Sequence, residues 1–192
     1  MDEIVNKQNH RSSAQDDKPG AAGKTVWLTG LSGSGKSTLA LTANAELQRR
    51  GLRSEVLDAD ALRKSLTRDL GFSREEREEN IRRIGIVAEL LSRHGVIVFV
   101  AAITPYRAMR DELRQRIPGF IEVYVDAPLE VCERRDPKGL YQRARSGMVP
   151  NFTGIDDPYE PPLDPEVHCL TALESIDESA ARIVSYVLRA CN

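Results

Sequence analysis

A glycine-rich turn between an apolar run and a helical run constrains this chain more than any other feature. The apolar residues 25–29 lead into Gly30-Leu-Ser-Gly-Ser-Gly-Lys-Ser-Thr38, and a helix-forming stretch follows at once. The pattern Gly-x-x-x-x-Gly-Lys-Ser in this context is typical of a P-loop, whose backbone N–H groups cradle phosphates. The glycine spacing differs from the Gly-x-Gly-x-x-Gly pattern of dinucleotide-binding folds. The sequence therefore predicts a nucleoside triphosphate site rather than a glycine-rich turn without a ligand.

The P-loop pattern also assigns roles to single residues. Lys36 is expected to reach the β- and γ-phosphates as a catalytic residue, and the Ser37 hydroxyl is expected to ligate the Mg²⁺ that bridges them. ATP and Mg²⁺ are therefore the predicted cofactors. The predicted nucleotide-binding residues are Gly30, Ser32, Gly33, Ser34, Gly35, Lys36, Ser37 and Thr38.

Length and charge narrow the class of protein. The chain has 192 residues and a net charge of −2, so no overall positive field attracts nucleic acid or anionic lipid. No apolar run is long enough for a membrane span, no export signal begins the chain, and three scattered cysteines form no metal pattern. We expect a cytoplasmic protein without nucleic-acid or membrane partners. We also expect its polar residues 1–23 to form a disordered N-terminal tail and residues 24–192 to form a single P-loop kinase domain.

Apolar runs alternate with helical patterns along the domain, which predicts an α/β fold with a parallel sheet flanked by helices. Strands are expected at 25–29, 53–57, 95–102 and 121–125. Helices are expected at 36–50, 60–67, 74–94, 105–116, 128–135 and 177–190. The proline-rich segment 136–165 is predicted to be a long loop, either a functional lid or a connection along the surface.

Two carboxylates follow the second predicted strand, in the sequence Leu57-Asp-Ala-Asp60, and Arg63 lies one turn further on. Parallel α/β sheets bind ligands at this carboxyl-terminal edge. Asp60 could cap the next helix, but capping accounts for only one aspartate. The pair beside a P-loop therefore indicates binding of Mg²⁺ or substrate.

The predicted helix 74–94 places two polar residues on its apolar face. Its stripe of Ile81, Ile84, Ala88 and Leu91 extends backwards to Arg77 and Asn80. An unpaired charge on that inward face would be costly, so these two residues either bind a ligand or pair internally with an acid of the sheet edge.

Two of the four phenylalanines, Phe72 and Phe152, lie in polar, loop-like surroundings. Phenylalanine usually packs in a core, but an aromatic ring in a loop beside a nucleotide site can stack on a base. Both interpretations stay open for these two rings.

Together these segments resemble the adenylylsulfate (APS) kinases of sulfate activation, from about residue 25 to residue 168. The resemblance rests on the P-loop, the Asp58–Asp60 pair and several further motifs. These are Asp69-Leu-Gly-Phe-Ser73, Arg77-x-x-Asn80-Ile-Arg-Arg83, Pro105-Tyr-Arg107, Glu122-Val-Tyr-Val-Asp126, Arg135-Asp-Pro-Lys-Gly-Leu-Tyr141 and Asn151-Phe-Thr-Gly-Ile-Asp-Asp-Pro-Tyr159.

The resemblance implies transfer of the γ-phosphoryl group of MgATP to the ribose 3′-hydroxyl of APS, which gives PAPS and ADP. It implies a nucleoside-monophosphate-kinase-like fold with a lid segment, and a homodimer. Asp60 matches the catalytic aspartate near the attacking hydroxyl. The matched substrate-binding residues are Asp60, Arg63, Phe72, Arg77, Asn80, Ile103, Thr104 and Phe152, with the two phenylalanines around the adenine of APS.

Four positions depart from the family pattern. Ala59 replaces a glycine, Thr67 an asparagine, Thr104 a serine and Pro150 a lysine. The family's serine at 104 is often described as a phosphorylated intermediate, but direct in-line transfer needs none. The alternatives are a related kinase for another nucleotide-linked anion and a catalytically weak nucleotide-binding regulatory protein. The intact Lys36 and Asp60 favour an active enzyme.

Overall fold

The computed structural model describes residues 23–191. The tail predicted for residues 1–23 lies outside the described part except for Gly23, and for that residue the prediction is wrong. Gly23 is buried, and its N–H donates to the Ser92 carbonyl at 2.9 Å. The packed domain therefore includes at least one residue that composition had assigned to the tail.

Five parallel strands form one sheet in the order β2-β3-β1-β4-β5. The strands are β1 (Thr25–Thr29), β2 (Ser54–Asp58), β3 (Ile97–Ala101), β4 (Phe120–Asp126) and β5 (Val167–Leu170). The P-loop strand β1 lies in the centre, with Val26 paired in register to Phe99 of β3 and to Ile121 of β4. All five carboxyl ends reach the same edge of the sheet, where α/β folds bind ligands.

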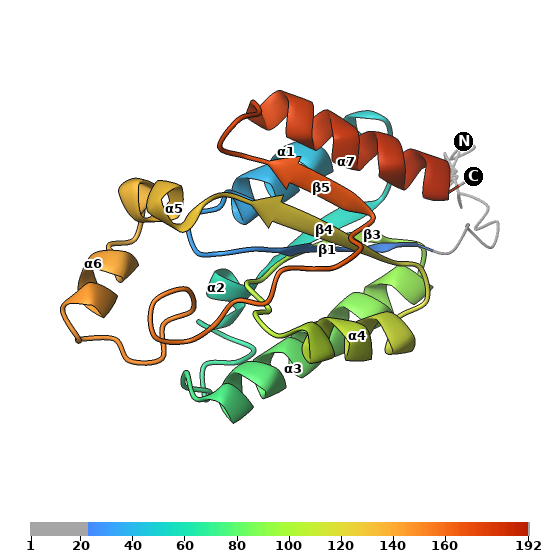
Figure 1. Ribbon diagram of the computed structural model, residues 1–192. Coiled ribbons are helices and arrows are strands. Elements are labelled where there is room, and N and C mark those ends of the chain that lie inside the picture. The colour runs from blue at the N-terminus through green and yellow to red at the C-terminus, as the bar shows by residue number, and fades with distance from the viewer. Residues whose placement is uncertain (1–22, 192) are drawn as a thin grey trace, which may run out of the picture.

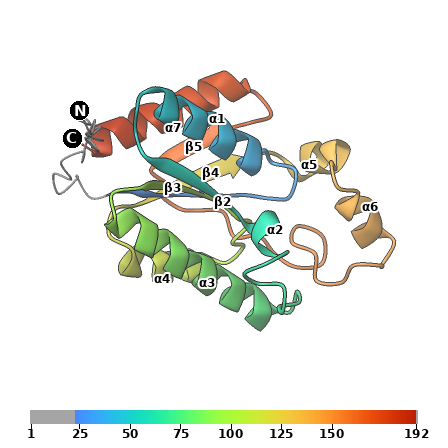
Figure 2. The same cartoon turned by 180° about the vertical axis from the view of Figure 1, so that it is seen from behind.

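Two pairs of helices cover the sheet. Helices α1 (Lys36–Arg49) and α7 (Ile176–Ala190) lie on one face, and α3 (Arg74–Arg93) and α4 (Arg107–Arg116) lie on the other (Figures 1 and 2). The short helices α2 (Ala59–Leu62), α5 (Leu129–Arg135) and α6 (Leu140–Arg145) gather near the carboxyl-terminal edge. This arrangement confirms the predicted parallel α/β fold.

The alternation along β1 shows how both faces are filled. Val26 and Leu28 are completely buried against α1 and α7, whereas Trp27 between them is completely buried against α3 and α4. Successive side chains of a strand point to opposite faces. A strand that is apolar at every position therefore belongs in the middle of a sheet with two helical layers.

Several predicted boundaries shift by one or two residues, two elements are additional to the prediction, and one helix is shorter than predicted. The edge strand β5 and the helix α6 were not predicted, and α6 lies inside the segment expected to be a loop. Helix α2 ends at Leu62, well before the predicted end at 67. Asp60 does not cap it, because the Asp58 side chain accepts the N–H groups of Asp60 and Ala61 at 2.9 and 3.2 Å.

A buried ion pair connects α4 with β4. The Arg110 guanidinium lies 2.7 Å from the Glu122 carboxylate, and these side chains are only 2% and 9% exposed. Arg110 also donates to the carbonyls of Thr104 and Glu160, each at 2.6 Å. One side chain thus joins β4, the β3–α4 loop and the end of the 136–165 segment.

Removing this cation should cost stability, because the buried Glu122 carboxylate would keep only the partly exposed Arg114 guanidinium, at 3.3 Å. We expect Arg110→Met to lower the free energy of unfolding by about 3–5 kcal/mol. The control Arg107→Met removes a guanidinium that is 44% exposed and 3.7 Å from Glu160, and should cost under about 1 kcal/mol. Chemical denaturation measures both variants, and equally small losses would contradict a structural role for Arg110.

Candidate active site

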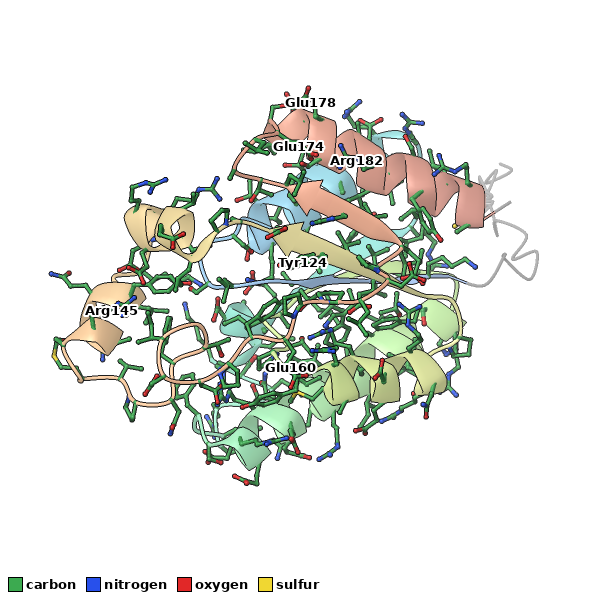
Figure 3. The ribbon with its side chains drawn as sticks, in the orientation of Figure 1. Tyr124, Arg145, Glu160, Glu174, Glu178 and Arg182 are labelled. Atoms are coloured by element: carbon green, nitrogen blue, oxygen red, sulfur yellow. The ribbon has the colours of Figure 1, made fainter. Side chains whose placement is uncertain are left out.

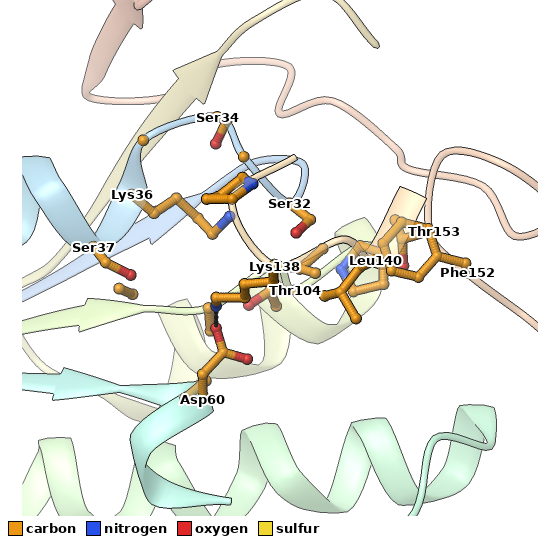
Figure 4. A pocket seen from close by; sticks show the side chains of 18 of the residues that line it. Ser32, Ser34, Lys36, Ser37, Asp60, Thr104, Lys138, Leu140, Phe152 and Thr153 are labelled. Carbon is orange, nitrogen blue, oxygen red and sulfur yellow. Dashed lines mark hydrogen bonds and ion pairs between the residues drawn. The ribbon is translucent and has the colours of Figure 1, made fainter. Parts of the chain in front are cut away.

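A single large cavity of about 1090 Å³ opens at the carboxyl-terminal edge of the sheet. The P-loop forms one wall, α2 and α3 form another, and the segments around residues 137–153 and 171–176 complete it (Figure 4). Every predicted site residue except Gly30 lines this cavity. The fold therefore brings together residues that are more than 100 positions apart in the sequence.

The P-loop has the backbone geometry that its glycines predict. Gly33 and Gly35 have φ angles of 75° and 107°, in the region that other residues rarely adopt. A Cβ at Gly30 would lie 2.3 Å from the Val125 carbonyl oxygen. Helix α1 begins at Lys36, so the positive end of its dipole also faces the cavity.

Lys36 folds back onto this loop. Its ammonium donates to the carbonyls of Gly30 at 3.0 Å and Leu31 at 2.7 Å, and no carboxylate among residues 23–191 forms an ion pair with it. Desolvation by burial lowers the pKa of Lys36 to about 8, although the charge of Asp60 acts in the opposite direction. The site thus contains a positive charge that an anion would stabilise.

The two aspartates have different partners. Asp58 accepts a hydrogen bond from the Ser37 hydroxyl at 2.5 Å, and it caps α2 through its other oxygen. Asp60 forms an ion pair with Lys138, which reaches across the cavity (Figure 4). Both members of this second pair are at least half exposed, so it contributes little stability and can be exchanged for a ligand.

Arg63 and Phe72 form a unit in the stretch between α2 and α3, where both line the cavity. The Arg63 guanidinium donates to the Gly71 carbonyl at 2.9 Å and lies 4.4 Å from the centre of the Phe72 ring. Phe72 is 63% exposed. An aromatic ring that is supported on one face and open to the cavity supports the stacking interpretation, and it excludes core packing for Phe72.

Arg77 and Asn80 lie on the inward side of α3, as their spacing predicts. Arg77 pairs with Asp157 at 3.0 Å and donates to the Thr153 hydroxyl at 3.1 Å. Its partner therefore comes from the 136–165 segment and not from the sheet edge. The Arg77 Nε and the Asn80 Oδ1 are buried without a hydrogen-bond partner among the described residues. Such groups are costly unless a ligand satisfies them.

Phe152 combines both interpretations that the sequence left open. It is only 9% exposed and packs edge-to-face on Tyr141 with 5.0 Å between ring centres, yet it also lines the cavity. The Tyr141 hydroxyl donates to the Ser32 carbonyl at 3.0 Å. Phe152 is therefore part of a small core that connects α6 with the P-loop.

Ile103 and Thr104 line the cavity at the end of β3. Thr104 has a φ of 46°, and its hydroxyl oxygen accepts the indole N–H of Trp27 at 2.9 Å. With 1% exposure, Thr104 supports the backbone and is not placed to carry a phosphoryl group.

Sequence reasoning missed several polar residues of the cavity region. Lys138 and Arg135 line it from the 135–138 stretch, and Thr171 lines it from the β5–α7 loop. Arg135 donates to the Thr171 carbonyl at 2.5 Å, and the Thr171 hydroxyl donates to the Ser34 carbonyl at 2.7 Å. Asp157 forms the ion pair with Arg77. For Arg135, Lys138 and Asp157 the only sequence signal is their position in motifs of the family, and Thr171 has no signal because it lies outside those motifs.

The cavity combines a P-loop lysine, a serine beside an aspartate, and a second acid on the opposite wall, which together define a P-loop phosphotransferase. Among residues 23–191, no helix is long and apolar enough to span a membrane. The family model for adenylylsulphate kinase matches residues 22–170. The adenylyl-sulfate kinase of Synechococcus sp. (strain JA-3-3Ab) is 64% identical over 159 residues, which are 83% of this chain and 90% of that protein. The chain therefore belongs to the adenylylsulfate kinase family, and its activity is the phosphorylation of APS to PAPS.

Solved structures agree with this assignment. The APS kinase of Mycobacterium tuberculosis in complex with AMPPNP and APS has a TM-score of 0.84 and 46% identity. The match covers 87% of this chain and 98% of that one. A gluconokinase from Sinorhizobium meliloti, at 20% identity and a TM-score of 0.57, shares the fold alone.

The lowered pKa of Lys36 predicts pH-dependent nucleotide binding. Bound phosphates stabilise the ammonium and raise its pKa, so above about pH 8 binding must take up a proton. Affinity for AMPPNP should be flat up to that pH and then fall by up to about tenfold per pH unit. Calorimetry in buffers of different ionisation enthalpy measures both the affinity and the proton uptake. Constant affinity to about pH 9.5 without proton uptake would contradict the assigned environment of Lys36.

Proposed function

We propose that the cavity binds MgATP and APS side by side and transfers the γ-phosphoryl group directly to the ribose 3′-hydroxyl. The observation that supports this arrangement most is that the P-loop lysine and the Asp60 carboxylate line one cavity from opposite walls. The complex of the Mycobacterium tuberculosis relative with AMPPNP and APS supports the same pair of ligands for this chain.

ATP is assigned to the P-loop side. Its polyphosphate would take the place of the carbonyl groups around Lys36, and the N–H groups of the P-loop and of the start of α1 would hold its oxygens. The adenine of ATP is assigned to the end of the cavity between Arg135 and the loop 171–176. A planar guanidinium beside a base can stack on it.

Mg²⁺ is assigned to Ser37 together with Asp58. Their oxygens lie 2.5 Å apart, and hydroxyl and carboxylate oxygens are ligands that Mg²⁺ prefers. Residues 23–191 hold no cluster of three or more His, Cys, Asp or Glu side chains that could bind a metal. This fits Mg²⁺, which usually binds through one or two protein groups, water and phosphate. When bound, the ion neutralises charge on the β- and γ-phosphates.

APS is assigned to the other half of the cavity. The exposed face of Phe72 and the edge of Phe152 would enclose its adenine. Arg63 and the unsatisfied Arg77 Nε offer donors for the phosphosulfate, and the unsatisfied Asn80 Oδ1 needs a donor such as a ribose hydroxyl or the adenine amino group. Ile103 and Thr104 form the floor next to them.

Asp60 is assigned as the group that orients the 3′-hydroxyl and accepts its proton. The hydroxyl oxygen forms a bond to the γ-phosphorus while the bond from that phosphorus to the β–γ bridging oxygen breaks, and ADP leaves. The Lys36 ammonium stabilises the charge that develops on the transferring group. Asp60 must exchange its Lys138 partner for the hydroxyl before it can act.

For the assembly we propose a homodimer, and for the location the cytoplasm. Both rest on the resemblance to the family. The APS kinase of Thiobacillus denitrificans, 33% identical with a TM-score of 0.64 over 29% of that chain, is a hexamer.

Asp60→Asn tests the catalytic assignment, because it keeps the shape of the side chain and removes the proton acceptor. We expect kcat to fall by about 10²–10⁴-fold, the usual contribution of a positioned acid–base group. The affinity of the ADP complex for APS, measured by calorimetry, should change much less. If that affinity collapses while turnover per bound APS is unchanged, Asp60 binds substrate and does not accept the proton.

Asp58→Asn tests the metal assignment. Asparagine caps helices as well as aspartate does, so α2 should persist. The loss of one anionic oxygen ligand should raise the Mg²⁺ concentration for half-maximal turnover by about ten- to a hundredfold. Asp60→Asn serves as the matched control, since its residual turnover should keep the wild-type Mg²⁺ dependence. An unchanged Mg²⁺ dependence in Asp58→Asn would leave Ser37 as the only protein ligand.

A further inference from the structure

Helix α6 presents one charged side chain to the cavity. From residue 139 to residue 153, the lining residues are Leu140, Arg143, Val149, Pro150, Asn151, Phe152 and Thr153. Arg143 is the only charged member of this stretch. The neighbouring cavity cations of the preceding stretch both have partners, since Lys138 is paired with Asp60 and Arg135 donates to the Thr171 carbonyl.

The orientation of α6 is fixed by packing. Tyr141 and Ala144 are buried, and the Tyr141 hydroxyl binds the Ser32 carbonyl of the P-loop at 3.0 Å. At the beginning of the helix, Asp136 accepts the N–H groups of Leu140 and Tyr141 at 2.8 and 3.2 Å. Residues three apart lie on the same side of a helix, which puts Arg143 beside Leu140 on the side that lines the cavity.

The two arginines of α6 differ in their partners. Arg145 forms an ion pair with Glu133 of α5 and does not line the cavity, and Figure 3 shows it on α6 at the edge of the molecule. Arg143 is exposed, and it forms no ion pair or side-chain hydrogen bond with any residue of the described range 23–191. One helix thus carries one neutralised and one unneutralised guanidinium.

Lys64 also lines the cavity as an exposed cation without an ion-pair partner in the described part of the chain. It follows α2 in a stretch of turns, however, and no side chain anchors it to the P-loop. Arg143 differs because its helix is attached to the phosphate-binding loop itself. Its guanidinium can therefore be held near bound oxyanions with little loss of conformational freedom.

We infer that Arg143 is a substrate-binding residue whose guanidinium pairs with an oxyanion of a bound nucleotide. The inference rests on the proposed function. The shared chemistry is a phosphate or sulfate oxygen, which a guanidinium binds through two parallel hydrogen bonds. The source is either the polyphosphate of ATP, on the Ser32 side of α6, or the phosphosulfate of APS, on the Phe152 side.

Two binding measurements on the full-length protein test this inference and separate the two sources. AMPPNP with Mg²⁺ probes the donor side, and APS added to the MgADP complex probes the acceptor side. In Arg143→Gln, one of these affinities should fall by about ten- to a hundredfold, because a charge-assisted hydrogen bond is lost. A loss in the first arm assigns the oxyanion to ATP, and a loss in the second assigns it to APS.

Matched variants distinguish binding from a structural effect. Arg145→Gln removes an arginine from the same helix outside the cavity and should leave both affinities unchanged. Arg143→Lys should recover part of the affinity, because lysine supplies the positive charge but not the two parallel N–H donors of a guanidinium. The melting temperature of Arg143→Gln should match the wild type, and its affinity loss should shrink at high salt.

Wild-type affinities in both arms, together with a wild-type KM for ATP and for APS, would overturn the assignment of Arg143. A fall in melting temperature with no recovery by lysine would also overturn it in favour of a structural role. These results are distinct from a failure of the proposed function. If the proposed function failed, the wild-type protein would not bind APS, while the binding measurement with AMPPNP would still test the role of Arg143.

Discussion

The Lys36 ammonium, held by two backbone carbonyls and by no carboxylate of residues 23–191, is the group on which the rest of the site depends. A charge in such a desolvated place is costly, and the lowered pKa of Lys36 reflects that cost. The neighbouring aspartates do not remove it, because Asp58 binds Ser37 and Asp60 binds Lys138. Phosphate oxygens are therefore the groups that complete this pocket. The folded structure holds Lys36 in this desolvated place through the central strand, the three P-loop glycines and the first turn of α1.

The segment after α5 consists of two parts with different attachment. Residues 153–166 are bound tightly to the body of the protein: Asp157 to Arg77, Tyr159 to Thr29 at 2.9 Å, and Glu166 to Arg114. The part with α6 is attached through the buried Tyr141 and Ala144, through the Tyr141 hydroxyl, and through the exposed pair of Lys138 with Asp60. The cavity wall that carries Arg77 is thus held by ion pairs and hydrogen bonds to the body of the protein, whereas the wall formed by α6 combines a small buried core with one exposed ion pair.

The sequence predicted most of what positions the site, and its failures have physical causes. The bounds of β1 were correct because its continuous apolar run ends at the P-loop motif, and the inward placement of Arg77 and Asn80 was correct because α3 has a long apolar periodicity. Strand β5 was missed because four residues with alternating burial give too short a pattern. Helix α6 was hidden by the prolines around it, although its own six residues form helices well. The pairs Arg77–Asp157 and Asp60–Lys138 span about 80 residues, and no local pattern encodes such contacts.

The central claim is that one cavity transfers the γ-phosphoryl group of ATP to the 3′-hydroxyl of APS. The most direct measurement incubates the protein with Mg²⁺ and ATP labelled in the γ-phosphate, and with APS, AMP or other nucleotides as acceptors. The account predicts that APS becomes labelled at its 3′-position with one ADP formed per product, and that AMP without the sulfate reacts far more slowly. Label that passes to another nucleotide in preference to APS, or only to water, would contradict the account.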